Sequence, residues 1–174
     1  SVNDAAMLYP QRNQDVLWTF LGSHDTERFL TRAGCDRRKL FAAAFFQFTS
    51  MGIPIIYYGD ELGMEGGADP DNRRPMRWDT VEGNPTRAHF QRLAALRAAH
   101  EALRIGVFRT WRAEADGLYA YERFTDDEHL RLYWHNEEVC TLDMDFLHEG
   151  MPRMERVAHW ITPNHPEPPL PQKA

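Results

Sequence analysis

Long apolar runs and clustered basic residues are both absent from this chain of 174 residues. Its apolar stretches are interrupted by Gln47, Thr49 and Ser50, so no segment reaches the ~20 residues that a membrane helix needs. The formal net charge is -6, and the Lys and Arg residues are scattered among acids. A charged-then-apolar secretory pattern is missing from its start. These features predict a protein that spans no membrane and binds no nucleic acid.

Cysteine is equally scarce. Cys35 and Cys140 lie far apart, and one pair is weak evidence for a disulfide framework, so we expect free thiols and a cytoplasmic location. The histidines form no pair four residues apart beside an acid, which predicts no metal site. No Lys followed by Ser or Thr comes after the glycines near residue 66, which excludes a phosphate-binding loop. We therefore expect no cofactor.

The first hundred residues alternate between strand and helix patterns. Residues 16–21 and 53–58 are short apolar runs closed by glycine, typical of parallel strands buried on both faces. Residues 36–51 repeat apolar side chains at helical spacing, with Asp36 as the expected N-cap and Gly52 as the stop. A second helix is expected over 85–103, with Pro85 in its first turn. Residues 59–84 form an unusually long loop, and such loops often carry function.

After residue 105 the pattern changes to short alternating runs. Residues 106–111, 118–124, 129–135 and 140–143 are separated by turn residues and predict a small antiparallel, sandwich-like β domain. Residues 162–174 are rich in proline and predict an extended or disordered tail. The chain thus divides into an α/β part, 1–104, and an all-β part, 105–174. Two strand–helix units cannot close a sheet by themselves.

Polar residues follow both predicted strands. His24 and Asp25 come directly after the first, and in a barrel of parallel strands the active site lies at this end of the strands. The local pattern leaves a second interpretation open, in which Asp25 caps a turn and His24 is a surface residue. The second cluster follows the second strand and comprises residues 58–61, with Asp60 and Glu61, and residues 69–79, with acids, arginines and a tryptophan. This mixture suits a polyhydroxylated ligand. A solvated loop held by Asp–Arg pairs is the alternative.

Three motifs in this region resemble the α-amylase family. Residues 20–26 (FLGSHDT) are similar to the family's motif after barrel strand seven, and residues 52–63 (GIPIIYYGDELG) to strand eight and its loop. Residues 69–73 (DPDNR) and 75–79 (PMRWD) resemble the neopullulanase, cyclomaltodextrinase and maltogenic amylase branch. The resemblance covers residues 16–79 and implies the last two strand–helix units of a (β/α)8 barrel, followed by an antiparallel domain.

The resemblance also implies roles for single residues. Asp25 matches the carboxylate that grips sugar hydroxyls and favours the oxocarbenium-like transition state without attacking. His24 matches its sugar-binding neighbour, and Asp69 and Arg73 match residues that bind the glucose on the non-reducing side of the cleaved bond. Ser23 stands where many relatives have Asn, although this branch often carries Ser.

The implied activity is retaining hydrolysis of α-1,4 bonds in maltooligosaccharides or cyclodextrins, with α-1,6 bonds and transglycosylation left open. Retaining glycosidases need a nucleophile and an acid/base carboxylate about 5 Å apart. In this family both follow earlier barrel strands, and no acid of this chain matches either motif. We therefore expect a C-terminal portion that is inactive alone and that binds α-glucan, and also either the missing N-terminal part or a second copy. Its rivals are a non-catalytic sugar- or protein-binding module and a fragment of a related glucosyltransferase.

Overall fold

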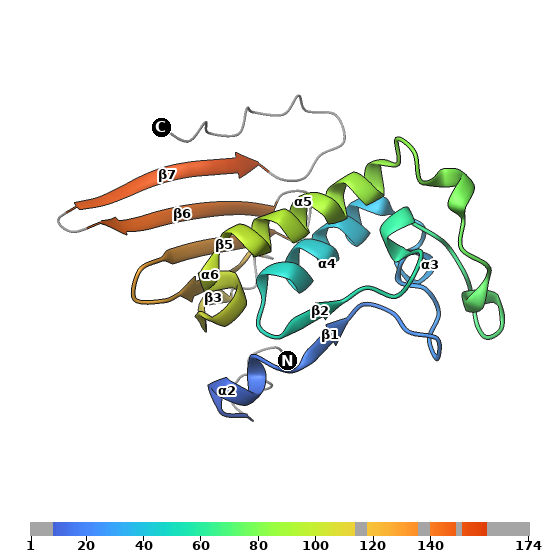
Figure 1. Cartoon of the computed structure of the whole chain (residues 1–174), viewed down its shortest axis with the longest axis horizontal. Helices are drawn as coiled ribbons and strands as arrows, with labels where there is room; N and C mark the ends of the chain where they lie inside the picture. Colours follow the sequence, from blue (N-terminus) through green and yellow to red (C-terminus); the bar gives the residue numbers. More distant parts are fainter. Residues whose placement is uncertain (1–8, 114–117, 136–139, 149–150, 160–174) are drawn as a thin grey trace.

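The computed structural model describes residues 9–113, 118–135, 140–148 and 151–159. In these ranges strands and helices alternate first, and a five-stranded sheet follows (Figure 1). The first part contains α2 (Gln11–Gln14), β1 (Trp18–Phe20), α3 (Phe29–Arg32), α4 (Arg37–Thr49), β2 (Ile53–Ile55), α5 (Pro85–Ala99) and α6 (Glu101–Ile105). None of the helices in the described ranges is both long and apolar enough to cross a membrane.

β1 and β2 form a two-stranded parallel sheet, in which Trp18 is the register partner of Ile53 and Phe20 that of Ile55. Each strand has three residues, fewer than the sequence predicts. The prediction that both faces are buried is wrong, because Trp18 is 71% exposed and Phe20 59%. α4 packs against the pair on one side, and no third strand of the described residues extends it. One apolar face is therefore open to solvent.

Helix α4 begins where the carboxylate of Asp36 accepts a backbone N–H two residues on, at 2.9 Å, which confirms Asp36 as the N-cap. Its buried apolar residues recur every three or four positions, as predicted. On the same side, Gln47 Nε2 donates to the backbone oxygens of Thr19 at 2.7 Å and Ile55 at 2.9 Å. One amide thus fixes the helix to both strands. The helix ends at residue 49, shortly before the predicted stop at Gly52.

Helix α5 begins at Pro85, as predicted, and the side-chain oxygen of Asn84 accepts two N–H groups of its first turn. The prediction of a single helix over 85–103 is wrong, because extended backbone at His100 separates α5 from α6. The carboxylate of Glu128 lies 2.5 Å from His100 Nδ1 and accepts Ala102 N–H at 2.8 Å. A side chain distant in sequence therefore caps α6, which no local pattern indicates.

The five-stranded sheet is antiparallel throughout and runs in sequence order. It consists of β3 (Val107–Ala113), β4 (Leu118–Phe124), β5 (His129–His135), β6 (Cys140–His148) and β7 (Met151–His159). The four predicted strands are confirmed, and β7 was missed because Pro152 and its charged neighbours weaken the alternating pattern. One sheet accounts for all five strands, so the sandwich stays a prediction, and the proline-rich tail lies outside the described residues.

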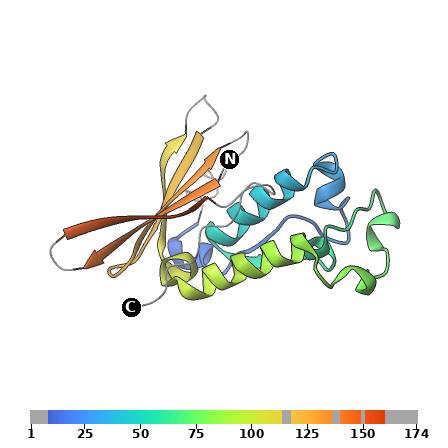
Figure 2. The ribbon, with the colours of Figure 1, turned by 90° about the horizontal axis from the view of Figure 1, so that it is seen from above.

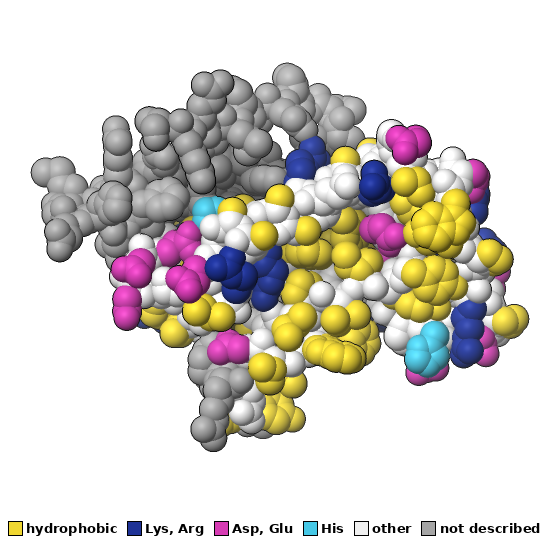
Figure 3. All heavy atoms as spheres, viewed as in Figure 1, with side chains coloured by type: hydrophobic (Ala, Val, Ile, Leu, Met, Phe, Trp, Pro, Cys, Tyr) yellow, Lys and Arg dark blue, Asp and Glu magenta, His cyan; other side chains and the backbone are white. Residues whose placement is uncertain are grey.

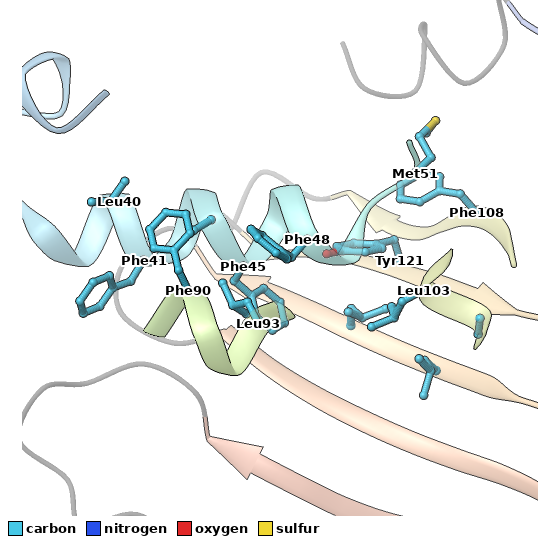
Figure 4. Packing of buried hydrophobic residues seen from close by; sticks show 14 of the residues in the cluster. Leu40, Phe41, Phe45, Phe48, Met51, Phe90, Leu93, Leu103, Phe108 and Tyr121 are labelled. Carbon is cyan, nitrogen blue, oxygen red and sulfur yellow. The ribbon is translucent and has the colours of Figure 1, made fainter. Parts of the chain in front are cut away.

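One hydrophobic cluster joins the helices to the sheet. Figure 4 shows aromatic side chains of α4 beside Phe90 and Leu93 of α5, with Tyr121 of the sheet beyond the end of α4, and Figure 2 shows the sheet standing at one end of the two helices. Its central members are Phe41, Phe45, Phe48, Phe90, Leu93, Leu103, Phe108 and Tyr121. Thr49 Oγ1, at the end of α4, lies 2.5 Å from the hydroxyl of Tyr121. The core therefore spans the predicted boundary at residue 105.

Two arginines, one half-buried and one fully buried, donate to carbonyl groups at the carboxyl ends of helices. Arg97 of α5 donates to Phe48 O at 2.7 Å and also contacts Gly52 O, beyond the end of α4. Arg123 of β4, which is fully buried, donates to Ala102 O at 3.1 Å and to Gly106 O at 3.0 Å at the end of α6. Burial lowers the pKa of Arg123 to about 10, so it remains charged at neutral pH and favours the negative end of the helix.

The buried imidazole of His89 predicts how stability depends on pH. His89 stacks on Phe41 with 4.4 Å between ring centroids, and its Nε2 lies 3.2 Å from Phe41 O. Burial lowers the pKa of His89 to about 4 from 6.5, so the unfolded chain takes up this proton at higher pH than the folded protein. The stability contributed by neutral His89 is complete above pH 6.5 and is lost as the pH falls towards 4.

We therefore expect acidification from pH 7 to pH 4 to destabilise the wild type more than His89→Gln, by up to about 3 kcal/mol. Urea unfolding at a series of pH values measures the difference, because the other titrating groups are common to both proteins. Parallel pH curves for wild type and variant would contradict the assignment.

Candidate active site

The chain leaves β1 through a tight turn. Ser23 N–H donates to Thr26 Oγ1 at 3.1 Å, and Thr26 N–H donates to Ser23 O at 3.3 Å. Helix α3 takes no cap from Asp25, since Arg28 occupies its N-cap position. The turn leaves the side chains of His24 and Asp25 exposed.

The connection after β2 is the long loop that the sequence predicts, and it is shaped by its own contacts. It contains three short 3-10 helices, η1 (Asp60–Leu62), η2 (Asp71–Arg73) and η3 (Trp78–Thr80). Asp71 accepts Gly67 N–H at 2.7 Å and pairs with Arg74 at 2.5 Å. The hydrogen bond from Gly67 and the Arg74 guanidinium lower the pKa of Asp71, so this carboxylate is ionised. These bonds give the loop a defined path.

The two loops meet through η2. Asn72 is fully buried, and its Nδ2 donates to His24 O at 2.8 Å and to Thr26 O at 2.9 Å. Arg73 Nε also donates to His24 O, at 3.2 Å. Because β1 and β2 run parallel, both loops leave the same end of the sheet, and η2 ties them together there.

All four residues singled out in the sequence lie at this junction, and we call them the loop cluster: His24, Asp25, Asp69 and Arg73. Arg73 is central, with Nε 2.9 Å from Asp69 Oδ1 and Nη2 4.0 Å from Asp25 Oδ1. His24 Nε2 lies 3.2 Å from Asp25 Oδ1. The side chains are exposed, from 46% for Arg73 to 72% for Asp25. Two carboxylates, a guanidinium and an imidazole thus face solvent together, able to accept from and donate to neighbouring hydroxyl groups.

Beneath the loop cluster lies a buried ion pair that the sequence did not indicate. Arg28 is fully buried, and its Nη1 donates to Asp60 Oδ1 at 3.1 Å and to Tyr58 O at 2.7 Å. Its guanidinium lies 4.7 Å and 4.8 Å from the ring centroids of Tyr57 and Tyr58. Burial raises the pKa of Asp60 to about 6, although Arg28 opposes the shift. Asp60 is therefore charged at neutral pH and opposite a cation.

Sequence reasoning missed Arg28, and it placed Asp60 and Asn72 in the second polar cluster without predicting that they are buried. Each forms hydrogen bonds to residues 30 or more positions away, and each stands within a charged or polar stretch that is equally consistent with a solvated loop. No local periodicity distinguishes a buried polar side chain from an exposed one in a loop. Within the part of the chain that the structure describes, no three His, Cys, Asp or Glu side chains converge on a position for a metal ion.

The amino-acid sequence of this chain was compared with known protein families. A family model, the alpha amylase catalytic domain, matches residues 4–125. The chain therefore belongs to the alpha-amylase family, which confirms the resemblance found in its motifs.

Individual members of the family share substantial sequence identity with this chain. Neopullulanase 2 of Thermoactinomyces vulgaris is 45% identical over 134 residues, which make up 76% of this chain and 23% of that protein. Cyclomaltodextrin glucanotransferase of Bacillus sp. (strain 38-2) is 48% identical over 101 residues, 56% of this chain and 13% of that protein. The solved structure of a cyclomaltodextrinase matches with a TM-score of 0.71 and 40% identity, over 81% of this chain and 25% of that one. The chain thus spans about a quarter or less of the length of these relatives.

The hydrogen bonds of the buried Asn72 amide should contribute to the stability of the loop junction. Asn72→Ala removes the donor to two backbone oxygens, and we expect a loss of about 1–3 kcal/mol in the free energy of unfolding. Asn72→Asp should lose more, because a carboxylate would face those oxygens in place of an N–H donor. Urea unfolding measures both. Asn13→Asp, at an exposed position, is the matched control, and equal stability of Asn72→Asp and the control would contradict the proposed contacts.

Proposed function

We propose that this chain forms the C-terminal part of a retaining α-glucan hydrolase that acts on α-1,4 glucosidic bonds of maltooligosaccharides or cyclodextrins, with α-1,6 bonds as a second linkage. In this proposal β1 and β2 are the last two strands of a (β/α)8 barrel, and residues from 105 onwards form a β-sandwich domain. One observation carries it: the loop cluster lies where two parallel strands end, which is where barrels of this class build their active sites.

Each member of the loop cluster has a proposed role. Asp25, whose carboxylate is exposed and shares Arg73 with Asp69, stabilises positive charge on the sugar ring in the transition state. His24 binds a hydroxyl beside it. Asp69 and Arg73 form an ion pair at 2.9 Å that offers both an acceptor and donors to the glucose on the non-reducing side of the cleaved bond. Neutral hydroxyls can exchange with the water around such exposed groups at little desolvation cost.

The nucleophile and the general acid are proposed to come from outside this chain. Retaining hydrolysis needs two carboxylates about 5 Å apart in addition to the transition-state carboxylate. Asp60 is buried against Arg28, and Asp71 is paired with Arg74, so neither is free to attack a sugar. The chain alone should therefore bind glucan weakly and should not hydrolyse it.

Incubation of the purified chain with maltoheptaose and with β-cyclodextrin tests this directly. We expect no reducing ends above the background of a buffer blank, because two of the three carboxylates are missing. Turnover that disappears in Asp25→Ala would overturn the proposal that the chain is inactive.

Complementation tests the role of Asp25. The part of neopullulanase 2 that precedes its match to this chain should restore hydrolysis when it is mixed with the wild-type chain. Asp25→Asn should lower the restored rate by about a hundredfold or more, because it removes charge stabilisation of the transition state. Asp79→Asn is the matched control: Asp79 is an exposed acid of the same loop that pairs with Arg77 outside the loop cluster. Equal rates for the two variants would refute the assignment.

The open face of β1 and β2 is the proposed binding surface for the rest of the barrel. Trp18, Phe20, Ile53 and Ile55 are all exposed, and Figure 3 shows hydrophobic side chains gathered over these strands. Register partners in a parallel pair lie on the same face, so these four form one apolar patch. Parallel sheets are normally covered on both faces, and an uncovered one favours association.

When no further strands are supplied, we expect two copies of the chain to associate through this patch, so that each copy covers the patch of the other. The double variant Trp18→Lys/Phe20→Lys should sediment as a monomer at concentrations where the wild type forms dimers or larger species. Trp78→Lys is the matched control, because Trp78 is 76% exposed but lies in η3, outside the patch. A monomeric wild type, or association that survives in the double variant, would contradict the proposed surface.

A transferase is the second candidate, favoured by the identity to a cyclomaltodextrin glucanotransferase. Both reactions use the same transition-state carboxylate, and they differ in whether water or a sugar hydroxyl accepts the glycosyl group. Products of the complemented protein separate them: linear maltooligosaccharides alone indicate hydrolysis, and cyclic or elongated products indicate transfer. A non-catalytic binding module would give neither.

A further inference from the structure

A buried ion pair links the stems of the two loops that carry the loop cluster. Arg28 lies three residues after Asp25, and Asp60 directly follows Gly59 at the end of the second strand run. Their side chains are 0% and 6% exposed and meet at 3.1 Å. Neither side chain belongs to the loop cluster, whose members are exposed. The pair therefore lies below the surface that would bind sugar.

We propose that the Arg28–Asp60 pair is a positioning element that holds the turn bearing His24 and Asp25 in register with the loop bearing Asp69 and Arg73. It rests on the proposed function, since the cluster that it positions is the proposed sugar site. Arg28 and Asp60 act through the backbone of the two loops and touch no substrate.

The directions of the hydrogen bonds support a positioning role. Arg28 Nη1 donates both to the carboxylate of Asp60 and to the backbone oxygen of Tyr58, so a single guanidinium fixes two points of the second loop. The backbone N–H of Arg28 donates to Gly66 O at 3.0 Å, and Gly66 N–H donates to Thr31 Oγ1 at 2.8 Å. The segment that follows Asp25 is thus bonded to the second loop at several separate points.

Close backbone packing at the pair also supports this role. A Cβ on Gly59 would lie 3.3 Å from Arg28 Nη1, and a Cβ on Gly22 would lie 3.4 Å from Asp60 Oδ2. The glycine that ends each strand run therefore brings backbone close to the ion pair. The flanking rings of Tyr57 and Tyr58 stack near the guanidinium and restrict its position further.

Stability alone is a poor explanation for such a pair. Two buried charges are expensive to desolvate, and apolar residues of similar volume commonly stabilise a fold as well or better. An apolar pair, however, forms no directional hydrogen bonds, so it cannot fix the position of one loop relative to the other. This difference allows positioning and stability to be separated by experiment.

The test compares Arg28→Met/Asp60→Leu with the wild type at pH 7.5. The double variant leaves no unpaired buried charge, so we expect it to fold, as judged by thermal unfolding and a dispersed NMR spectrum. The first readout needs no sugar: nuclear Overhauser contacts between the Asn72 side-chain amide and residues 24–26 should be lost or weakened severalfold. The second is the affinity for maltoheptaose, followed by NMR titration, which should fall about tenfold.

Controls make each outcome decisive. Arg123→Met removes another fully buried arginine, at the end of α6, and should change stability without changing either readout. Arg28→Lys keeps the charge but not the guanidinium geometry, and it should weaken the Asn72 contacts, which provides the test if the double variant does not fold. Unchanged Asn72 contacts in a folded variant would overturn the positioning role. A wild type that does not bind maltoheptaose would instead overturn the sugar site and leave the first readout to decide on positioning.

Discussion

The parallel pairing of β1 with β2 is the constraint on which the candidate site depends. The two strands run in the same direction, with Trp18 as the register partner of Ile53, so the chain leaves both strands at the same end of the sheet. Two loops separated by more than thirty residues in sequence are thereby brought together, and the hydrogen bonds of Asn72 and Arg73 to His24 O become possible. Gln47 of α4 supports the pairing from one side by binding a backbone oxygen of each strand.

The site has two layers with different physical characters. In the outer layer, Asp25, Asp69 and Arg73 are exposed, so their charges are hydrated and each partner can exchange its contacts for those of a ligand. In the inner layer, Arg28 and Asp60 are buried, and breaking their contact would leave a charge without solvent. The exposed groups thus lie above a buried, charge-paired base, and sites built on such supported loops hold their side chains in a defined geometry.

Predictions from the sequence succeeded where the relevant contacts are local. The cap at Asp36 and the start of α5 at Pro85 follow from residues within one turn, and the strands β3 to β6 follow from alternation between turn residues. The four residues of the loop cluster were predicted from their match to family motifs, and hydrophobic periodicity did not indicate them. The break at His100 depends on Glu128, and the burial of Arg28 depends on Asp60, so both required the tertiary structure. The open face of β1 and β2 could not be predicted either, because continuous apolar runs indicate burial whether or not the covering strands are present.

Helix α4 connects the antiparallel sheet to β1 and β2 through polar contacts gathered at its carboxyl end. At its carboxyl end, Thr49 contacts the Tyr121 hydroxyl of β4, and Arg97 of α5 binds the carbonyl of Phe48. Two residues before Thr49, Gln47 holds the backbones of β1 and β2. The aromatic core fills the space between the helices and the sheet, so a shift of the sheet would move α4 and, with it, both strands (Figure 4). The helix against which the two site-bearing strands are aligned is therefore itself packed against the antiparallel sheet.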